Sequence, residues 1–258
     1  MSAWTDDTRP ANPPAAINGD ADLAAIGRVL ADPGRGRMLL ALGDGRALPA
    51  SRLAAEAGVS AATASSHLAR LTDAGLLAVE PHGRFRYYRL AGPEVGQLLE
   101  TIALLAPATP VRSLRQGTQA AAIRAARTCY DHLAGRLGVE VMAALLDAGH
   151  LAGGGGRHDP DGSDPRAGHG HEVDYRVTDS GRAFFAELQV PVARKPLRYC
   201  IDWTEQRHHL SGALGRALLA RLIELGWVRR APASRAVRLT DDGRRGLLDV
   251  LDVRLTSR

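Results

Sequence analysis

The chain has 258 residues, enough for one large domain or two ordinary ones, and 45% of them are hydrophobic, so it can form a core. Aromatic residues make up only 4%, which favours an aliphatic core and helices. The formal net charge of +5 is almost all arginine, which suits phosphate and base-edge recognition but also follows from a GC-rich genome. The two cysteines exclude a disulfide framework. With no membrane-length apolar run and no signal-peptide pattern, we expect a cytoplasmic protein without a membrane partner.

The first ordered elements are predicted to be helices. Residues 1–21 are rich in proline, aspartate and asparagine and are expected to be a disordered tail. Asp22 is an N-cap candidate ahead of apolar residues at helical spacing. Pro33 is predicted to begin a second helix, which Gly43 ends.

A helix-turn-helix pattern follows these helices. The spacing of Ala54, Gly58 and Ala64 puts small residues where two helices touch and glycine where the turn needs a positive φ. Ser60 is predicted to cap the second helix, which ends near Ala74. Its outward face carries short groups, as a helix needs when its backbone enters a major groove. The candidate DNA contacts on this helix are Ala62, Thr63, Ser65, Ser66, His67 and Arg70.

A basic hairpin is predicted after this helix. Residues 76–90 read as two strands with a turn at Pro81-His82-Gly83, and the returning strand begins with Arg84 and Arg86. A basic hairpin beside a recognition helix is a wing, placed to touch phosphates or the minor groove, so both arginines are candidate DNA contacts. A further helix is expected from Pro93 to Leu105. The winged helix-turn-helix domain is therefore predicted to span residues 22–108.

The segment from Ala24 to about Leu105 resembles the ArsR/SmtB family of winged-helix repressors. The resemblance rests on MLLAL after Pro33–Arg37, on SAATASSHLARLTDAGLL and on GRFRYYRL. It implies a homodimer formed through the first and last helices, double-stranded operator DNA as ligand, and repression relieved by an inducer. Metal-sensing members carry a Cys-x-Cys in the positioning helix, or Asp/His pairs in the last helix. This chain has neither, so the family's metal sensing is not carried over.

Residues 109–258 repeat parts of the first domain. RLTDAGLL recurs as ALLDAGHL and RLIELGWV, YRVTDSGR pairs with VRLTDDGR, and LAAEAGVS is echoed by LAGRLGVE, with Gly138 in the place of the turn glycine. We therefore expect a mainly α fold with small β-hairpin wings, in which degenerate winged-helix units form a sensing and dimer-supporting domain. Residues 139–148 carry carboxylates and no Ser, Thr or Arg, so we expect no second DNA contact there.

A flexible loop is predicted over residues 150–172, where the first of these units should have its wing. It contains His158, His169 and His171, which we interpret as solvated side chains rather than metal ligands.

Two segments of the second half gather its cysteines and much of its acid and imidazole. They are RTCYDHLAG (Arg127–Gly135) and YCIDWTEQRHHL (Tyr199–Leu210). We treat the first as a helix, on which Cys129 and His132 share a face. We predict that the two segments adjoin and form the effector-responsive part of the protein. The candidate effector residues are Cys129, Tyr130, His132, Cys200, Trp203, Glu205 and His208.

Three interpretations of these segments remain open. The cysteines and His132 suit a soft-metal or thiolate site. The aromatic residues and Glu205 suit a small-molecule pocket. Alternatively, the cysteines are small buried residues of the core, and the acids and histidines satisfy helix ends. We assign no cofactor, and the residue types favour a small molecule over a metal ion as effector.

The predicted function is a sequence-specific DNA-binding transcriptional regulator, a repressor that an effector in the C-terminal region releases. One alternative is a DNA-binding or architectural protein without a ligand. A thiol-based enzyme is the other, with Cys129 as nucleophile and a neighbouring base. No phosphate loop, oxyanion turn or cofactor motif accompanies that cysteine, so we do not expect an enzyme.

Overall fold

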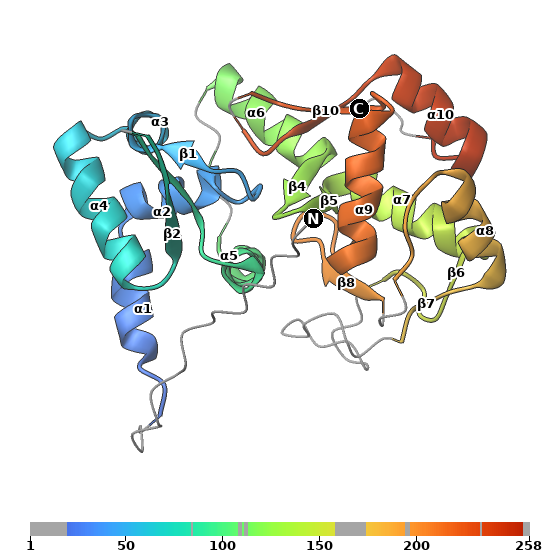
Figure 1. The fold of residues 1–258 in the computed structure, drawn as a ribbon, viewed down its shortest axis with the longest axis horizontal. Helices are drawn as coiled ribbons and strands as arrows, with labels where there is room; N and C mark the ends of the chain where they lie inside the picture. The colour runs from blue at the N-terminus through green and yellow to red at the C-terminus, as the bar shows by residue number, and fades with distance from the viewer. Residues whose placement is uncertain are drawn as a thin grey trace, which may run out of the picture.

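The computed structural model describes residues 20–83, 85–107, 110, 113–157, 174–193, 197–232 and 234–254. The predicted tail up to residue 19, the wing residue Arg84, and the loop residues His158, His169 and His171 lie outside this part. Two domains stand side by side, with helix α5 of the first next to the second (Figure 1). The first consists of α1 (Leu23–Leu30), α2 (Pro33–Ala41), β1 (Leu48–Pro49), α3 (Ala50–Ala57), α4 (Ala61–Asp73), β2 (Leu77–His82), β3 (Phe85–Leu90) and α5 (Pro93–Leu105).

The predicted helix boundaries in this domain are confirmed by their capping contacts. Asp22 accepts a hydrogen bond from the Ala25 amide at 3.0 Å, and Pro33 occupies the first turn of α2. Ser60 accepts from the Thr63 amide at 3.2 Å and so caps α4. Gly58 ends α3 with a φ of 67°, a left-handed conformation that a residue with a Cβ adopts only under strain. The helix-turn-helix therefore forms where its sequence pattern predicts it.

The wing differs from the prediction in two details. Strand β2 pairs with β3 from Leu77↔Leu90 to His82↔Phe85, so the turn lies after His82 and the predicted turn at residues 81–83 is wrong. Pro81 fits inside a strand because β2 is an edge strand and one of its sides needs no amide donor. The sequence also gave no sign of β1, which pairs with the other edge of β3 through Leu48↔Tyr88.

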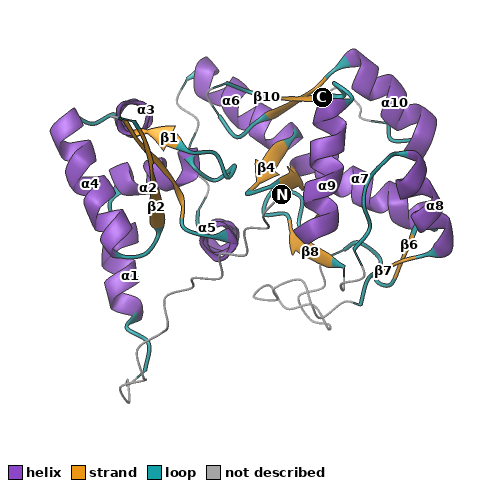
Figure 2. Ribbon diagram, in the orientation of Figure 1, coloured by secondary structure: helices purple, strands orange, loops and turns teal. Residues whose placement is uncertain are grey.

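The second domain is built from two similar units that follow the connecting helix α6 (Leu114–Ala125). Each unit runs through a β-hairpin, a 13-residue helix, a small hairpin and a helix capped by threonine (Figures 1 and 2). The first unit comprises β4 (Arg127–Cys129), β5 (His132–Ala134), α7 (Gly135–Asp147), β6 (Leu151–Ala152), β7 (Arg176–Val177) and α8 (Asp179–Glu187). The second comprises β8 (Arg198–Ile201), β9 (His208–Ser211), α9 (Gly212–Glu224), β10 (Val228–Arg230), β11 (Val237–Leu239) and α10 (Asp241–Leu251).

Part of the predicted repeat pattern is found in both units. Thr178 and Thr240 cap α8 and α10, each accepting from an amide three residues on at 3.0 Å. The predicted helix over RTCYDHLAG is wrong, because these residues form β4 and β5 around a two-residue turn at Tyr130 and Asp131. The predicted turn at Gly138 is also wrong, since that glycine lies inside α7. No helix-turn-helix precedes the small hairpin in the described residues of either unit, so winged-helix descent of this domain stays a prediction.

A glycine near the start of α7 and of α9 lets each helix lie directly on its own hairpin. A Cβ at Gly138 would lie 2.6 Å from the Leu133 carbonyl oxygen, and one at Gly215 would lie 2.5 Å from that of Leu210. Both distances are well inside van der Waals contact with backbone atoms. The two units therefore use the same close approach of helix to strand.

The two domains dock through side chains that each contributes to the other's core. Tyr130, from the turn between β4 and β5, packs against the core of the first domain, and Leu104 of α5 packs against the core of the second. The Tyr130 amide donates to the Gly43 carbonyl at 2.9 Å. In the described part of the chain, no helix is both long and apolar enough to cross a membrane.

Replacing Gly215 by alanine should destabilise the protein, because the added Cβ meets a carbonyl oxygen of β9 that cannot move without separating α9 from its hairpin. We expect a loss of about 1–3 kcal/mol in the free energy of unfolding, measured by chemical denaturation. Gly36→Ala in α2 is the matched control. Nothing lies within 4 Å of its added Cβ, and alanine should stabilise the helix by about 0.5–1 kcal/mol. Equal stability of Gly215→Ala and the unmodified protein would contradict the close contact.

Candidate functional site

Helix α4 presents one buried and one exposed face. Ala64, Leu68 and Leu71 are buried against the domain core. The exposed face consists of short side chains and one arginine: Ala62, Thr63, Ser65, Ser66 and Arg70. On the neighbouring wing, Arg86 is exposed. The helix therefore offers a face on which its backbone can approach a DNA groove closely.

One predicted DNA contact lies elsewhere. The His67 side chain is only 12% exposed, and its Nε2 lies 3.5 Å from Oδ1 of Asp32, the residue that caps α2. Its Nδ1 lies 3.4 Å from an amino nitrogen of Arg35. His67 thus joins α4 to the start of α2 and is turned away from the exposed face. Arg84, the other wing arginine, lies outside the described residues.

The two predicted effector segments adjoin, as expected, but as hairpins. In β4–β5, Cys129 lies opposite His132, and in β8–β9, Cys200 lies opposite His209. One ligand atom from each of these four side chains lies within 4.8 Å of the other three. The two imidazole rings stack with their centroids 5.2 Å apart. The two units therefore each contribute one cysteine and one histidine to a single group, which we call the Cys-His cluster.

The cluster is deeply buried. His209 is 0% exposed, Cys129 2% and His132 5%, and Cys200 is partly exposed. Nε2 of His132 and both ring nitrogens of His209 are buried and make no hydrogen bond to the described residues. Buried polar atoms are nearly always satisfied, so three orphaned ring nitrogens beside two sulfur atoms require an explanation.

Charges inside the cluster perturb its titrations. A hydrogen bond from the Cys129 thiol, together with the neighbouring His132, holds the pKa of Cys200 well below its usual value. The same hydrogen bond and burial raise the pKa of Cys129. Burial lowers the pKa of His132, but the Cys200 sulfur and Asp131 outweigh it and raise that pKa to about 9. Burial lowers the pKa of His209 to about 4. The pKa values of the two sulfurs are therefore shifted in opposite directions.

A carboxylate lies beside Nδ1 of each histidine in the cluster. Asp131 Oδ1 is 3.1 Å from Nδ1 of His132, and Asp202 Oδ2 is 3.8 Å from Nδ1 of His209. A carboxylate at Nδ1 favours the tautomer that keeps its proton on that nitrogen and leaves Nε2 free to bind another group.

Four other predicted effector residues lie around the cluster and not in it. Tyr130 faces the first domain, where Gly96 and Gly45 leave room for it. Trp203 covers the guanidinium of Arg127 at 4.7 Å, and Glu205 accepts from the Thr204 hydroxyl at 3.3 Å. His208 points to the opposite face of its strand, where its Nδ1 lies 2.7 Å from the hydroxyl of Tyr175. The structure therefore does not bring these four together with the cysteines as one pocket.

His209 is the cluster residue missing from the predicted effector residues, and a sequence signal for it exists. The two units share the pattern R-x-C followed by H-L-[A/S]-G-x-L-G, as RTC…HLAGRLG and RYC…HLSGALG. In this alignment His209 matches His132, and His208 has no equivalent. Comparing the second domain with itself, and not with the first domain, would have found the residue.

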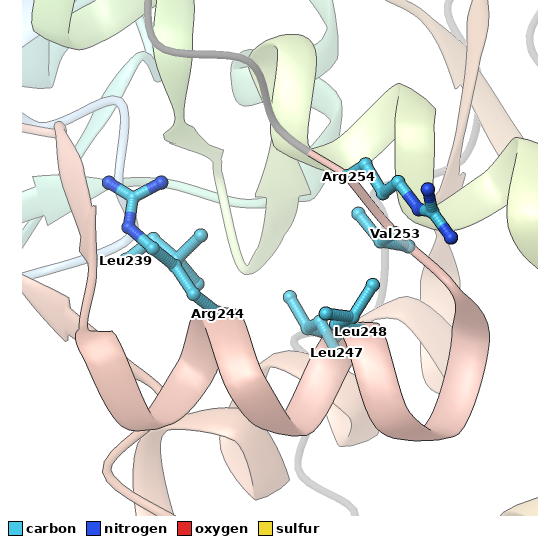
Figure 3. A pocket seen from close by; sticks show the side chains of 6 residues that line it. All are labelled: Leu239, Arg244, Leu247, Leu248, Val253 and Arg254. Atoms are coloured by element: carbon cyan, nitrogen blue, oxygen red, sulfur yellow. The ribbon is translucent and has the colours of Figure 1, made fainter.

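A separate surface groove of about 490 Å³ lies beside α10. Its lining consists of Leu239, Arg244, Leu247, Leu248, Val253 and Arg254 (Figure 3). None of the predicted effector residues lines it, so the small-molecule interpretation gains no support from this groove.

Several known proteins are similar to the first domain in sequence. A family model described as a helix-turn-helix domain matches residues 30–80. The structure of the winged helix-turn-helix domain of Mb0332 from Mycobacterium bovis is 28% identical and covers 34% of this chain and 88% of that one, with a TM-score of 0.30. The regulator CmtR of Mycobacterium tuberculosis is 42% identical over 77 residues, which are 30% of this chain and 64% of CmtR.

One relative matches nearly the whole chain. The HTH-type transcriptional regulator YdfF of Bacillus subtilis is 38% identical over 240 residues, covering 91% of this chain and 99% of YdfF. The similarity thus includes both domains. The chain belongs to the same family of HTH-type transcriptional regulators as YdfF, and it is a DNA-binding regulator whose helix-turn-helix is followed by the wing β2–β3.

Proposed function

We propose that the chain is a homodimeric repressor that reads an inverted-repeat operator and releases it when an effector binds the second domain. The observation that carries the DNA-reading step is the exposed face of α4, which includes Ser66 and Arg70, together with the exposed wing residue Arg86. Short hydroxyl groups reach base edges, and an arginine on a wing reaches phosphates or the minor groove. Two free cysteines accord with a cytoplasmic site of action.

Exposed apolar side chains on α1 and α5 support the homodimer. Leu23 is 79% exposed, Ile102 38% and Leu105 74%. These helices are the first and last of the DNA-binding domain, where ArsR-like proteins are expected to dimerise. Two-fold symmetry then places two copies of α4 in successive major grooves, with half-site centres roughly 34–36 Å apart or a multiple of that.

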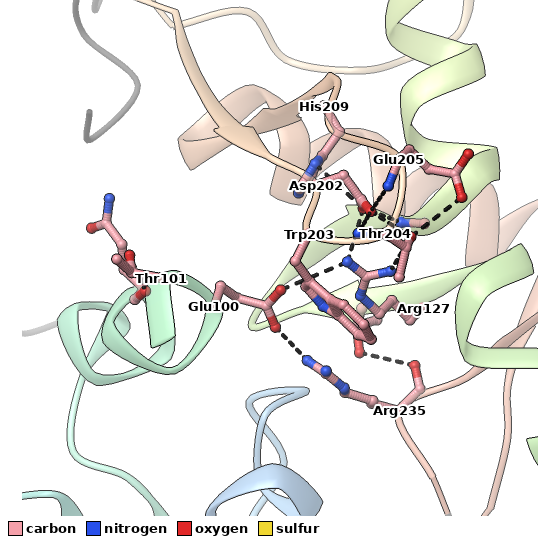
Figure 4. Close-up of polar contacts among 12 residues, drawn as sticks. Glu100, Thr101, Arg127, Asp202, Trp203, Thr204, Glu205, His209 and Arg235 are labelled. Carbon is pink, nitrogen blue, oxygen red and sulfur yellow. Dashed lines mark hydrogen bonds and ion pairs between the residues drawn. The ribbon is translucent and has the colours of Figure 1, made fainter. Parts of the chain in front are cut away.

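A buried network of charges supports control by the second domain. Glu100 of α5 forms an ion pair with Arg235 and lies 3.8 Å from Arg127 (Figure 4). Arg127 in turn donates to Asp202 at 2.9 Å, and the Asp202 carboxylate also accepts from the Gly135 amide at 2.7 Å. Arg127 and Asp202 are fully buried. A change around Asp202 therefore reaches the helix expected to set the spacing of the two recognition helices.

Ser66→Ala and Arg86→Ala should weaken DNA binding in different ways. Loss of a base contact at Ser66 should lower the affinity for the operator by about 1–3 kcal/mol and relax the sequence preference at one position. Loss of Arg86 should weaken binding to all DNA sequences by the same factor. It should also reduce the slope of log affinity against log salt concentration by about the contribution of one phosphate contact. Both are measured by fluorescence anisotropy across a salt series, on an operator found by selection from a random library.

Arg182→Ala, an exposed arginine of α8, is the matched control and should change neither affinity nor salt slope. If Arg86→Ala kept the salt slope of the unmodified protein, the wing would not contact phosphate. If the selection recovered only single-stranded DNA or RNA, the proposed operator binding would be wrong.

Arg127→Ala should destabilise the protein strongly, because it leaves Asp202 and Glu100 buried without their shared cation. Breaking a buried ion pair from one side costs about 3–5 kcal/mol, which should appear in the free energy of unfolding from chemical denaturation. Arg127→Met with Asp202→Asn removes both charges of the pair and should recover part of the loss. A double variant less stable than Arg127→Ala would show that the other hydrogen bonds of the Asp202 carboxylate, such as the one from the Gly135 amide, matter more than its pairing with Arg127.

A further inference from the structure

We propose that the Cys-His cluster is a tetrahedral site for one Zn²⁺ ion or a chemically similar divalent cation, bound by Cys129, His132, Cys200 and His209. Two thiolates and two imidazoles are the ligand set that such borderline-soft cations take in closed, four-coordinate protein sites. The assignment of this ion as the effector rests on the proposed function. The binding of the ion does not.

The geometry of the cluster suits such an ion. With metal–sulfur bonds of about 2.3 Å and metal–nitrogen bonds of about 2.0 Å, tetrahedral ligand atoms lie about 3.3–3.8 Å apart. The four candidate ligand atoms lie within 4.8 Å of one another, so the widest pair must close by about 1 Å. Each hairpin delivers its cysteine and histidine from directly paired positions, so this adjustment needs only a small approach of the two hairpins.

The orphaned ring nitrogens identify the donor atoms. Nε2 of His132 and Nε2 of His209 are buried and make no hydrogen bond to the described residues, whereas Nδ1 of each ring faces Asp131 or Asp202. Histidines that bind metals commonly present one nitrogen to the ion and donate the other N–H to a carboxylate. His132 shows this arrangement with Asp131, and at His209 the Asp202 carboxylate lies 3.8 Å from Nδ1, just beyond hydrogen-bond distance.

The charges also balance. Binding forms two metal–sulfur and two metal–nitrogen bonds, and the protons still held on the thiols and on His132 pass to the solvent. Two thiolates neutralise a divalent cation, so the loaded site is uncharged, as its burial requires. Cys200 is the least buried of the four proposed ligands.

The site is also placed to act on DNA binding. Asp202, which lies beside His209, is the same carboxylate that holds Arg127, and Arg127 lies 3.8 Å from Glu100 of α5 (Figure 4). An ion that draws His209 toward the sulfurs moves the imidazole relative to Asp202. The coupling therefore runs from the ion through one histidine and one ion-pair network to the first domain.

Metal content and Co²⁺ spectroscopy of the full-length protein test the site without DNA. Protein purified under reducing, anaerobic conditions and then stripped with a chelator should take up one Zn²⁺ per chain. With Co²⁺ it should show the intense d–d bands of a tetrahedral site and sulfur-to-cobalt charge transfer, saturating at one equivalent. Cys200→Ser and His209→Gln should abolish stoichiometric uptake. Asp131→Asn should keep the tetrahedral spectrum with an affinity about 10–100-fold lower.

His150→Gln is the matched control, a partly buried histidine of the same domain outside the cluster, and it should still bind one ion. If a variant misfolds, the metal uptake and Co²⁺ spectrum of the stripped, unmodified protein still decide whether the site exists. Absence of charge transfer, octahedral Co²⁺ spectra, or uptake unchanged in Cys200→Ser would overturn the metal site. So would a Cys129–Cys200 disulfide in the anaerobically purified protein.

A second measurement separates the regulatory role from the site itself. Operator affinity should differ at least fivefold between the stripped and the Zn²⁺-loaded protein. Glu100→Gln should remove most of that difference and leave Co²⁺ binding intact. Equal operator affinities of the two forms would refute the ion as effector while the metal site stands. A protein that binds Co²⁺ as expected and no duplex DNA would instead refute the proposed function.

Discussion

The contact between the two hairpins of the second domain decides where its reactive side chains lie. Strands β5 and β9 come from sequence segments more than seventy residues apart, yet their histidines stack at 5.2 Å. Each histidine carries a paired cysteine with it, because Cys129 and Cys200 lie directly opposite in their own hairpins. Without this contact the domain would contain two separate cysteine–histidine pairs. With it, all four side chains converge at one buried point.

The same contact brings unequal electrostatic surroundings to two similar halves. His132 faces Asp131 and the low-pKa sulfur of Cys200, which raise its pKa to about 9, whereas burial dominates at His209 and lowers its pKa to about 4. The difference arises from the loops. The first hairpin has a two-residue turn, whereas the second has a longer connection, in which Asp202 is held by Arg127. The two similar hairpins thus supply the cysteine–histidine pairs, and their different loops supply the different neighbours.

Docking of the two domains imposes a further constraint, since each buried charge needs a partner from another element. Glu100 comes from α5, Arg127 from β4, Asp202 from the β8–β9 connection and Arg235 from the loop before β11. A carboxylate in such a place is tolerated only while its cations stay close. The orientation of α5 relative to the second domain is therefore tied to the packing around the cluster, and this supports communication between the two domains.

The sequence by itself determined the DNA-binding domain. Caps at Asp22 and Ser60, the turn glycine Gly58 and the alternation in the wing are local signals, and local hydrogen bonds or backbone strain enforce them. The side of α4 that is buried also followed from its periodicity, with the exception of His67, which a contact with α2 turns inward. The helices α8 and α10 could also be predicted from the sequence, because the threonine that caps each of them is a local signal for a helix start.

Only the tertiary structure decided the character of the second domain. The predicted helix over RTCYDHLAG was wrong because this segment contains a two-residue turn, in which Tyr130 has a φ of 58°. The turn is stabilised by packing of Tyr130 into the first domain, a long-range contact that no local sequence pattern indicates. The choice between His208 and His209 likewise depended on register, since neighbouring residues of a strand point to opposite faces. The positions of cysteine and histidine in the sequence indicated which two segments contribute to the cluster. Their convergence required two hairpins to pack together, and that long-range contact is set by the whole core and not by the residues that it unites.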